Sequence, residues 1–268
     1  MTATAQLVLG RPRSLSTKQM HYCPGCGHGI VHRLVAQAID DLGLQERSVV
    51  VAPVGCAVFV YNYMEFDGVE AAHGRAPAVA TGIKRVRPDL FVFTYQGDGD
   101  LGAIGTAEIV HAAARGENIS VVFVNNAVYG MTGGQMAPTT LAGQRTTSTP
   151  TGRETTRAGN PIRVSEMLAT LEGPAYIART SVHNPAAVRR TAAAIRRAFA
   201  CQVAGLGFSM VEVLSPCPTN GGVSPKDALR WLEDRMIPYY PLGDIKVTPG
   251  LETLEQPAIA QKVIQRGP

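Results

Sequence analysis

The sequence lacks long hydrophobic segments, because no apolar run approaches the roughly 18 residues that a membrane-spanning helix needs. Residues 1–9 also lack the continuous apolar stretch of a secretory signal. Charge of one sign is sparse: the net charge is +4 over 268 residues, and the arginines are scattered instead of forming a basic stripe. We therefore expect a cytoplasmic protein that binds neither a membrane nor nucleic acid.

Cysteine is scarce too, with five in the chain. In an intracellular protein this argues against disulfides and for a metal site or catalysis. Cys23 and Cys26 flank a Pro-Gly turn that aims both thiols at one point, while Cys56 and Cys217 each follow an apolar segment beside Gly or Pro. Cys201 lies in a predicted helix and is expected to be a packed thiol. The four loop cysteines favour a [4Fe-4S] cluster.

Zinc is the alternative metal at the first cysteine pair. His28 and His32 complete a Cys2His2 set with Cys23 and Cys26, but the intervals are far shorter than zinc sites of that type use. The two histidines are one helical turn apart, so we expect one to cover the cluster and the other to face solvent. A zinc-stabilised interaction domain stays open as a second class of function.

Strand-like and helix-like segments alternate along the chain. This alternation predicts an α/β fold, a doubly wound, mostly parallel sheet with helices on both faces. The apolar content of 45% is sufficient for one such domain. The expected strands are 49–52, 91–96, 119–124, 175–178 and 208–213, and the expected helices are 30–42, 76–86, 101–115 and 185–202.

Three regions are expected in sequence order. An N-terminal extension covers residues 1–20, the binding domain covers 21–237, and a Pro-punctuated C-terminal arm covers 238–268 and contacts partner subunits. Within the domain, the Thr-, Gly- and Arg-rich segment 139–159 has no apolar period, so it is expected to be a loop over the functional site.

Polar residues follow two of the predicted strands at the points where the strands end. Gly97-Asp98-Gly99-Asp100 follows strand 91–96, and its glycines let backbone amides and a helix N-terminus approach phosphate oxygens. Asn125-Asn126 follows the next strand, at the edge where open α/β sheets bind ligands. Asp98, the Asn126 amide oxygen and the Val128 carbonyl supply the hard oxygen donors that Mg²⁺ prefers.

The same glycines also satisfy the dinucleotide-binding pattern G-x-G-x-x-G, which makes a nicotinamide or flavin site the rival interpretation. That site needs an acidic residue at the end of the second strand to bind ribose. Here the strand ends in asparagines, and this favours the magnesium interpretation.

Several of these motifs occur together and in the same order in one known family. Between Tyr22 and Trp231 the chain resembles the β subunit of 2-oxoacid:ferredoxin oxidoreductases, closest to the 2-oxoisovalerate/2-oxoglutarate type. The segments that carry the resemblance are 23–29, 54–56, 73–76, 97–100, 125–135 and 215–217.

The resemblance implies roles for particular residues. His73 is implied to lie at the reactive end of the cofactor; the alternative is a hydrogen-bonded histidine that orients the loop before Arg75. The implied ligands are Cys23, Cys26, Cys56 and Cys217 for the [4Fe-4S] cluster; Asp98, Asn126 and Val128 for Mg²⁺; and Val54, Gly55, Cys56, Ala57, Gly97, Gly99, Asp100, Gly130 and Met131 for thiamine diphosphate.

The resemblance also implies a reaction and an assembly. A 2-oxoacid is oxidatively decarboxylated, coenzyme A takes the acyl group, and ferredoxin receives the electrons. The chain has room for one cofactor domain, so it is expected to be inactive alone. The implied partners are an α subunit with the pyrimidine-side domain, a γ subunit or domain, and a ferredoxin-like δ subunit.

The preferred substrate is expected to be a branched-chain acid such as 2-oxoisovalerate. Apolar Phe59 stands where relatives that take 2-oxoglutarate tend to carry a basic residue, and an apolar side chain would leave a distal carboxylate unpaired. Phe59 as plain core is the alternative. 2-Oxoglutarate or pyruvate as substrate, and a non-redox thiamine diphosphate-dependent decarboxylase subunit, also stay open.

Overall fold

A single seven-stranded sheet forms the centre of the chain in the computed structural model, which describes residues 10–251. The strand order is β2-β1-β3-β4-β6-β5-β7, and all neighbouring pairs are parallel except β5 and β7. The strands are β1 Ser48–Ala52, β2 Asp67–Glu70, β3 Phe91–Gly97, β4 Ser120–Asn125, β5 Pro174–Ser181, β6 Phe208–Leu214 and β7 Gly243–Val247.

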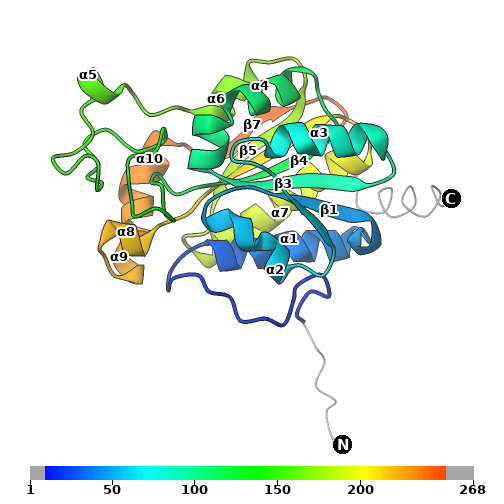
Figure 1. Ribbon diagram of the computed structural model, residues 1–268, viewed down its shortest axis with the longest axis horizontal. Coiled ribbons are helices and arrows are strands. Elements are labelled where there is room, and N and C mark those ends of the chain that lie inside the picture. The colour runs from blue at the N-terminus through cyan, green and yellow to red at the C-terminus, as the bar shows by residue number, and fades with distance from the viewer. Residues whose placement is uncertain (1–9, 252–268) are drawn as a thin grey trace, which may run out of the picture.

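Helices cover both faces of this sheet, as predicted (Figure 1). The α-helices are α1 His28–Asp41, α2 Val60–Tyr63, α3 Ala76–Val86, α4 Thr106–Ala114, α5 Thr155–Ala158, α6 Val164–Ala169, α7 Pro185–Val203, α8 Pro218–Gly221, α9 Pro225–Trp231 and α10 Ile237–Tyr239. Shorter 3₁₀ turns are η1 Gln45–Arg47 and η2 Cys56–Phe59, and π-helical turns are η3 Asp100–Ile104 and η4 Leu232–Met236.

Two hydrophobic cores lie on opposite faces of the sheet. The larger core packs α1, α2 and α7 against one face, with Val35, Ile39 and Phe199 completely buried. The smaller core packs α3, α4 and α6 against the other face, around Leu101 and Ile109. Because β1, β3, β4, β5 and β6 are covered on both sides, they are the nearly continuous apolar runs that sequence analysis identifies.

The two strands that were not predicted are the edges of the sheet. All four residues of β2 are exposed, so no hydrophobic run marks this strand. Strand β7 lies within residues 238–268, the expected C-terminal arm, and pairs antiparallel with β5. Residues 243–247 are therefore part of the central sheet. A contact between the arm and a partner subunit stays a prediction, and residues 1–9 and 252–268 lie outside the described residues.

The helix predicted at 101–115 is divided in the structure. A π-helical turn, η3, comes first and places the Gly105 N–H 3.0 Å from the Asp100 carbonyl oxygen, and α4 begins after it. Such wider turns are frequent at functional sites, and this one lies at the carboxyl end of β3.

None of the helices within residues 10–251 is both long enough and apolar enough to span a lipid bilayer.

Candidate functional site

A cavity of about 290 Å³ lies at the carboxyl ends of β1, β3 and β4. Open parallel sheets bind ligands at this edge. The cavity contains His73 and every residue predicted to bind magnesium or thiamine diphosphate. Its lining is His28, Val54, Gly55, Cys56, Ala57, His73, Gly97, Asp98, Gly99, Asp100, Ala103, Ile104, Val124, Asn126, Val128, Tyr129, Gly130, Met131 and Thr132.

Sequence analysis missed several residues of this lining. Tyr129 and Thr132 lie within the 125–135 motif, which is the signal that could have identified them. Ala103 and Ile104 lie in the π-helical turn η3, where sequence analysis predicted the first turns of an α-helix. His28 was assigned to the cysteine motif alone.

The buried Asp100 carboxylate joins three loops of the cavity wall. Its Oδ1 accepts hydrogen bonds from the backbone N–H groups of Val54 and Gly74, at 3.1 and 2.8 Å, and from His73 Nδ1 at 2.7 Å. Its Oδ2 accepts one from Gln96 Nε2 at 2.6 Å. The Asp100 side chain is thus committed to the protein, and its neighbouring backbone is left to meet a ligand.

Two glycines are required by close approaches at this wall. Gly74 has φ +78°, and a Cβ there would lie 2.7 Å from the Gly105 nitrogen. A Cβ on Gly99 would lie 2.8 Å from the ring of Tyr129. A side chain at either position would push apart the segments that enclose the cavity.

Asp98 is buried, with 4% of its surface exposed, and takes part in none of the ion pairs among residues 10–251. Burial raises the pKa of this carboxyl to about 7, although hydrogen bonds from the Thr139 hydroxyl and from nearby backbone N–H groups act in the opposite direction. A buried carboxylate without a cationic partner among residues 10–251, in one cavity with Asn126 and Val128, suits a Mg²⁺ ion.

The 125–128 turn carries the other two predicted magnesium donors. Asn126 Oδ1 accepts the Val128 N–H at 3.3 Å, and the Ala127 N–H donates to Asn125 Oδ1 at 3.1 Å. Ala127 has φ +61°, the only positive φ at a non-glycine residue among those described. A residue with a Cβ in this conformation stores strain, and such strain is typical of functional turns.

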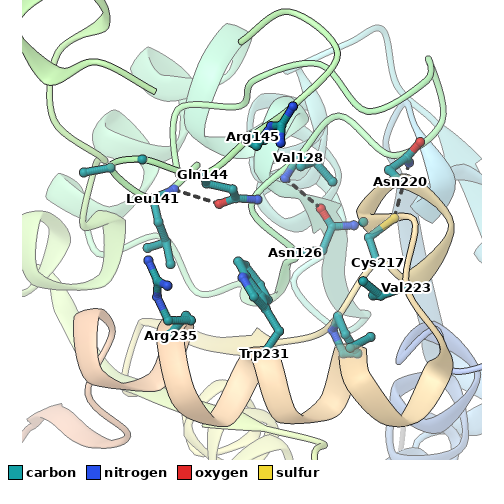
Figure 2. Close-up of a pocket in the computed structure, with 15 residues that line it drawn as sticks. Asn126, Val128, Leu141, Gln144, Arg145, Cys217, Asn220, Val223, Trp231 and Arg235 are labelled. Atoms are coloured by element: carbon teal, nitrogen blue, oxygen red, sulfur yellow. Dashed lines mark hydrogen bonds between the residues drawn. The ribbon is translucent and has the colours of Figure 1, made fainter. Parts of the chain in front are cut away.

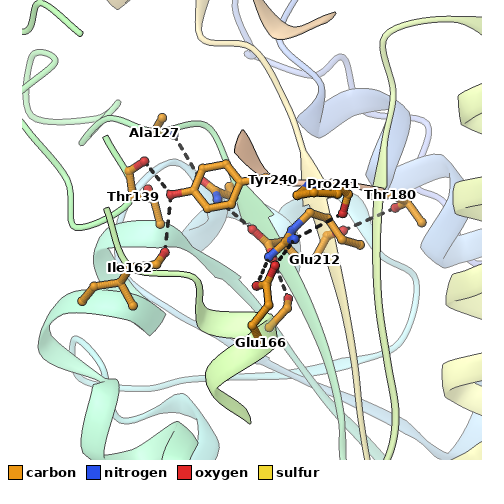
Figure 3. A network of polar contacts seen from close by, with 11 residues as sticks. Ala127, Thr139, Ile162, Glu166, Thr180, Glu212, Tyr240 and Pro241 are labelled. Atoms are coloured by element: carbon orange, nitrogen blue, oxygen red, sulfur yellow. Dashed lines mark hydrogen bonds and ion pairs between the residues drawn. The ribbon is translucent and has the colours of Figure 1, made fainter. Parts of the chain in front are cut away.

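A buried polar network lies behind the 125–128 turn (Figure 3). Asn125 Nδ2 donates to Glu212 Oε1 at 2.7 Å, and the Arg179 Nε donates to Glu212 Oε2 at 2.8 Å. Arg179 is fully buried and also pairs with Glu166 through both terminal nitrogens. The network fixes the side chain of Asn125, and through it the start of the turn.

The segment 139–159 is a loop beside the site up to residue 154, as predicted, but residues 155–158 form the short helix α5, which its composition did not predict. Arg153, with 5% of its surface exposed, lies within this loop and donates six hydrogen bonds to backbone carbonyls. The acceptors are Ala137, Pro138, Thr140, Ala158, Gly159 and Asn160. The segment is therefore held from inside by one buried guanidinium, while its Leu141 packs in a hydrophobic cluster with Leu232, Met236 and Tyr240.

The four loop cysteines come from three segments that converge beside the cavity: Cys23 and Cys26 precede α1, Cys56 is the first residue of η2, and Cys217 precedes α8. Burial, followed by the nearby thiolates of Cys217, Cys56 and Cys23, raises the pKa of Cys26 to about 12. Burial, Cys217 and Cys23 raise the pKa of Cys56 to about 11. The four thiols are thus electrostatic neighbours. Cys56 also lines the 290 Å³ cavity at the carboxyl ends of β1, β3 and β4, whereas Cys201 is buried in α7 as predicted.

Packing against the α8–α9 region holds the first cysteine pair. A Cβ on Gly25 would lie 2.6 Å from Pro225, and the Gly27 N–H donates to Ser215 Oγ at 3.1 Å. Cys23 itself is exposed. Within residues 10–251 no three or more Cys, His, Asp or Glu side chains form a ready-made metal site. The thiols suit a [4Fe-4S] cluster by donor type and mutual proximity, and the cluster stays a prediction.

The expectation that one of His28 and His32 faces solvent is wrong. Both are buried, with 2% and 0% of their surfaces exposed. His28 Nδ1 is hydrogen-bonded to the Tyr95 hydroxyl at 2.8 Å, and His32 Nε2 lies 3.1 Å from the Tyr22 hydroxyl. Burial lowers the pKa of both imidazoles, that of His28 to about 4. Both histidines lie on the buried side of α1. The short spacing between the cysteines and the histidines could not reveal this burial.

Phe59 is not among the residues that line the cavity. It is partly buried, and its ring packs edge-on against His21 with centroids 4.5 Å apart. Nothing in this chain alone therefore places Phe59 against a substrate.

A second cavity, of about 280 Å³, lies between the 141–145 segment and the helices α8 and α9 (Figure 2). Asn126, Val128 and Cys217 line it, so it adjoins both the magnesium donors and a predicted cluster ligand. Asn220 connects the lining of the first cavity to a predicted cluster ligand. Its Nδ2 donates to the Gly130 carbonyl at 2.8 Å and to Cys217 Sγ at 3.3 Å.

The parallel sheet, the glycine-rich turn after β3 and the asparagines after β4 define a thiamine diphosphate-binding domain. A family model described as the C-terminal TPP-binding domain of thiamine pyrophosphate enzymes matches residues 53–213. The chain is 38% identical over 213 residues to the 2-oxoglutarate synthase subunit KorB of Archaeoglobus fulgidus, covering 80% of this chain and 75% of that protein. The chain belongs to the family of 2-oxoacid:ferredoxin oxidoreductase subunits.

Two further similarities bear on the type of family member. The ketoisovalerate oxidoreductase subunit VorA of Methanothermobacter thermautotrophicus is 52% identical over 226 residues, 84% of this chain and 47% of that protein. A solved 2-oxoglutarate:ferredoxin oxidoreductase of Magnetococcus marinus, with 2-oxoglutarate, coenzyme A and succinyl-CoA bound, matches with a TM-score of 0.72 and 30% identity, covering 85% of this chain and 73% of that one. The chain spans about half the length of its VorA relatives.

Proposed function

We propose that this chain is the thiamine diphosphate-binding β subunit of a CoA-dependent 2-oxoacid:ferredoxin oxidoreductase. The reaction is the oxidative decarboxylation of a 2-oxoacid to an acyl-CoA and CO2, with reduction of ferredoxin. The observation that carries the proposal is the position of Cys56, which lines the cofactor cavity and is an electrostatic neighbour of Cys26, Cys23 and Cys217. A redox cluster bound there would adjoin the reacting centre.

The oxygen donors of the cavity would hold the diphosphate and its metal. Asp98, the Asn126 amide oxygen and the Val128 carbonyl would bind Mg²⁺, and backbone groups around Gly99 and Gly130 would meet the diphosphate. Thiamine diphosphate, when bound, supplies a sink for the electron pair left by decarboxylation.

His73 is the ionisable side chain best placed to meet substrate. Its side chain is 44% exposed and lines the cavity, while Nδ1 donates to Asp100 at 2.7 Å. This bond fixes the ring and leaves Nε2 as the nitrogen that can contact a ligand. His73 can therefore contact a substrate and also help to orient the loop before Arg75. The Nδ1 bond to Asp100 serves the second role, and Nε2 remains for the first.

Cys23, Cys26, Cys56 and Cys217 would ligate a [4Fe-4S] cluster. Burial and repulsion between neighbouring thiolates make the free deprotonated thiols unfavourable, as the raised pKa values of Cys26 and Cys56 show. An iron-sulfur cluster removes this repulsion by binding the thiolates directly. The cluster would take up the electrons released in the oxidation.

Partner subunits complete the site in this proposal: an α subunit with the pyrimidine-side domain, a γ subunit or domain, and a ferredoxin-like δ subunit. Ile104 and Met131 support a cover over the cavity, because both line it and yet expose 50% and 48% of their surfaces. Large apolar side chains beside a cavity mouth are typical of surfaces that another chain buries.

The proposed substrate is a branched-chain 2-oxoacid such as 2-oxoisovalerate. The 52% identity to a ketoisovalerate oxidoreductase subunit supports this choice over 2-oxoglutarate, for which the similarities are 38% and 30% identical. Phe59 adds support only if a partner subunit brings the substrate toward it.

The test is anaerobic purification of the chain with its co-expressed partners. Initial rates of ferredoxin reduction are measured with 2-oxoisovalerate, 2-oxoglutarate and pyruvate, each with coenzyme A. We expect the fastest rate with 2-oxoisovalerate and no turnover by the isolated chain. A fastest rate with 2-oxoglutarate would overturn the substrate, turnover by the chain alone would overturn the division of labour, and a colourless thiamine-bound complex would indicate a non-redox decarboxylase.

A further inference from the structure

Two consecutive buried threonines contact both sides of the predicted magnesium site. Thr139 and Thr140 each have 0% of their surface exposed. The Thr139 hydroxyl donates to Asp98 Oδ2 at 3.0 Å, and the Thr140 hydroxyl donates to the Ala127 carbonyl at 2.6 Å. One short stretch of the 139–159 loop thus bonds to the carboxylate after β3 and to the turn after β4.

We propose that Thr139 and Thr140, here called the threonine clamp, are positioning residues for magnesium and diphosphate binding. The clamp holds Asp98 and the 125–128 turn in the arrangement that the metal requires before the metal arrives. This inference rests on the proposed function, since it concerns the same site.

The 125–128 turn needs such a clamp because Ala127 has φ +61°. For a residue with a Cβ this left-handed conformation is unfavourable, and it persists only where the surroundings enforce it. The Ala127 carbonyl accepts from Thr140 and also from Gln144 Nε2 at 3.2 Å. Asn126 and Val128, the two metal donors of the turn, lie on either side of the residue that these bonds restrain.

The Asp98 carboxylate needs a donor for a different reason. It is buried, it has no ion-pair partner among residues 10–251, and its Oδ1 already accepts the Gly99 N–H at 2.9 Å. The Thr139 hydroxyl satisfies Oδ2 and so selects one rotamer of the carboxylate. The backbone N–H groups of Asn126 and Ala127 also hydrogen-bond to this carboxylate, and Thr139 adds a side-chain donor that is neutral. A hydroxyl can orient the group without competing with the cation for it, as an arginine or lysine would.

The clamp is itself held from two directions. Inside the loop, Arg153 donates to the Thr140 carbonyl at 2.7 Å, and the Thr140 hydroxyl accepts the Ala137 N–H at 2.8 Å. From the C-terminal side, the Tyr240 hydroxyl donates to the Thr139 carbonyl at 2.8 Å (Figure 3). The backbone of the clamp is therefore fixed, so its two hydroxyls point at defined acceptors.

Threonine, serine and valine separate the role of the hydroxyl from the role of packing. Thr→Val keeps the shape and removes the donor, while Thr→Ser keeps the donor and removes a methyl group. The complex with partner subunits is used, and Mg²⁺ is titrated in the presence of thiamine diphosphate, with circular dichroism or calorimetry reporting binding. The thermal midpoint of the metal-free complex is recorded alongside.

We expect Thr139→Val and Thr140→Val each to weaken Mg²⁺ binding roughly threefold to tenfold, the effect of losing one hydrogen bond. The Ser variants are expected to bind within about twofold of the wild type, because they retain the donor. In Ala127→Gly/Thr140→Val we expect part of the lost affinity to return, because glycine adopts the left-handed conformation without strain.

The clamp is refuted if the valine variants bind Mg²⁺ like the wild type, or if Ser and Val variants lose affinity equally. A drop in thermal midpoint that matches the loss of affinity in all four variants would likewise overturn it, since that pattern indicates general destabilisation. If a valine variant does not assemble, the alanine variant at the same position removes the same donor with a smaller side chain and is expected to weaken Mg²⁺ binding to a similar extent; unchanged binding there overturns the proposal. A wild-type complex that binds no Mg²⁺ and thiamine diphosphate refutes the proposed function instead.

Discussion

The oxygen-donor half and the thiol half of the candidate site are built in different ways. Asp98, Asn126 and Val128 stand in a wall where backbone and side-chain hydrogen bonds fix each segment before any ligand binds. The four cysteines instead come from the chain before α1, from η2 and from the chain before α8, and one of them, Cys23, is exposed. A single carboxylate and neutral oxygen donors can be preorganised by hydrogen bonds within the polypeptide, whereas neighbouring thiolates repel one another and need their metal to come together.

Cys56 belongs to both halves, so its removal should have the largest effect. We expect Cys56→Ala to lose the iron and all ferredoxin reduction, because the cluster loses a ligand at the point where it meets the cofactor. Iron and sulfide analysis of the anaerobic complex measures this. Cys201→Ala is the matched control: its thiol is buried in the core on α7, and its iron content should equal that of the wild type. Full iron in Cys56→Ala would contradict the ligand assignment.

Asp98→Asn tests whether the halves are separable. A unit charge about 4 Å from a divalent ion is attracted by about 8 kcal/mol at an effective dielectric constant of 20. Because Asn keeps an oxygen ligand and water replaces part of the lost attraction, we expect magnesium-dependent cofactor binding to weaken by roughly a thousandfold. Iron content should not change. Exposed Asp89, changed to Asn, serves as the control. Loss of iron together with the cofactor would show that the two halves form one unit.

Arg179→Met tests the buried network that supports the oxygen-donor half. Removing one partner of a buried ion pair leaves Glu212, which is 1% exposed, without its cation, and is expected to cost about 3–5 kcal/mol of the free energy of unfolding. Denaturant titration of the complex measures the loss. Arg87→Ala, which breaks the exposed pair with Asp89, should leave the stability unchanged. Equal free energies of unfolding for the two variants would show that the Arg179–Glu212 network does not stabilise the site.

Asn220→Ala is expected to give the smallest effect, because it breaks only the link between the halves. Its Nδ2 donates to Gly130 and to Cys217 Sγ. We expect iron to be retained, cofactor affinity to fall roughly threefold to tenfold, and the reduction potential of the cluster to shift, since hydrogen bonds to its sulfurs tune that potential. Redox titration followed by electron paramagnetic resonance measures the shift, with the exposed neighbour Thr219→Ala as control. An unchanged reduction potential of the cluster would contradict a hydrogen bond from Asn220 that tunes it, and would leave Asn220 with a structural role alone.

The sequence predicts the parts of this protein that depend on local pattern. Each of the five buried strands contains an apolar run, although β5 continues past the predicted 175–178 to Ser181 and buries Arg179. Polar residues at the ends of β3 and β4 had to meet because carboxyl ends of parallel strands share one edge. All residues predicted to bind magnesium or thiamine diphosphate consequently line one cavity, whereas Cys23, Cys26 and Cys217 are not part of its lining. The edge strands β2 and β7 escaped prediction because exposed short strands carry no apolar period.

Contacts between segments that are distant in the sequence could not be predicted from local patterns. The composition of 139–159 predicts a loop, but only the folded chain shows that Thr139 meets Asp98 and that Arg153 fills the interior of the loop. The burial of His28 and His32 likewise depends on Tyr95 and Tyr22, which pack on α1 from elsewhere in the chain. Local spacing identifies the chemistry of the site, and tertiary packing decides how each group is held.

The most direct test of the account is an anaerobic single-turnover experiment on the purified complex without ferredoxin. We predict that adding a 2-oxoacid bleaches the visible absorbance of an iron-sulfur cluster and produces a paramagnetic resonance signal, and that omitting Mg²⁺ and thiamine diphosphate prevents both changes. A complex that contains the cofactor but no iron, or whose cluster stays oxidised after the 2-oxoacid is added, would contradict the claim that the two halves act as one redox site.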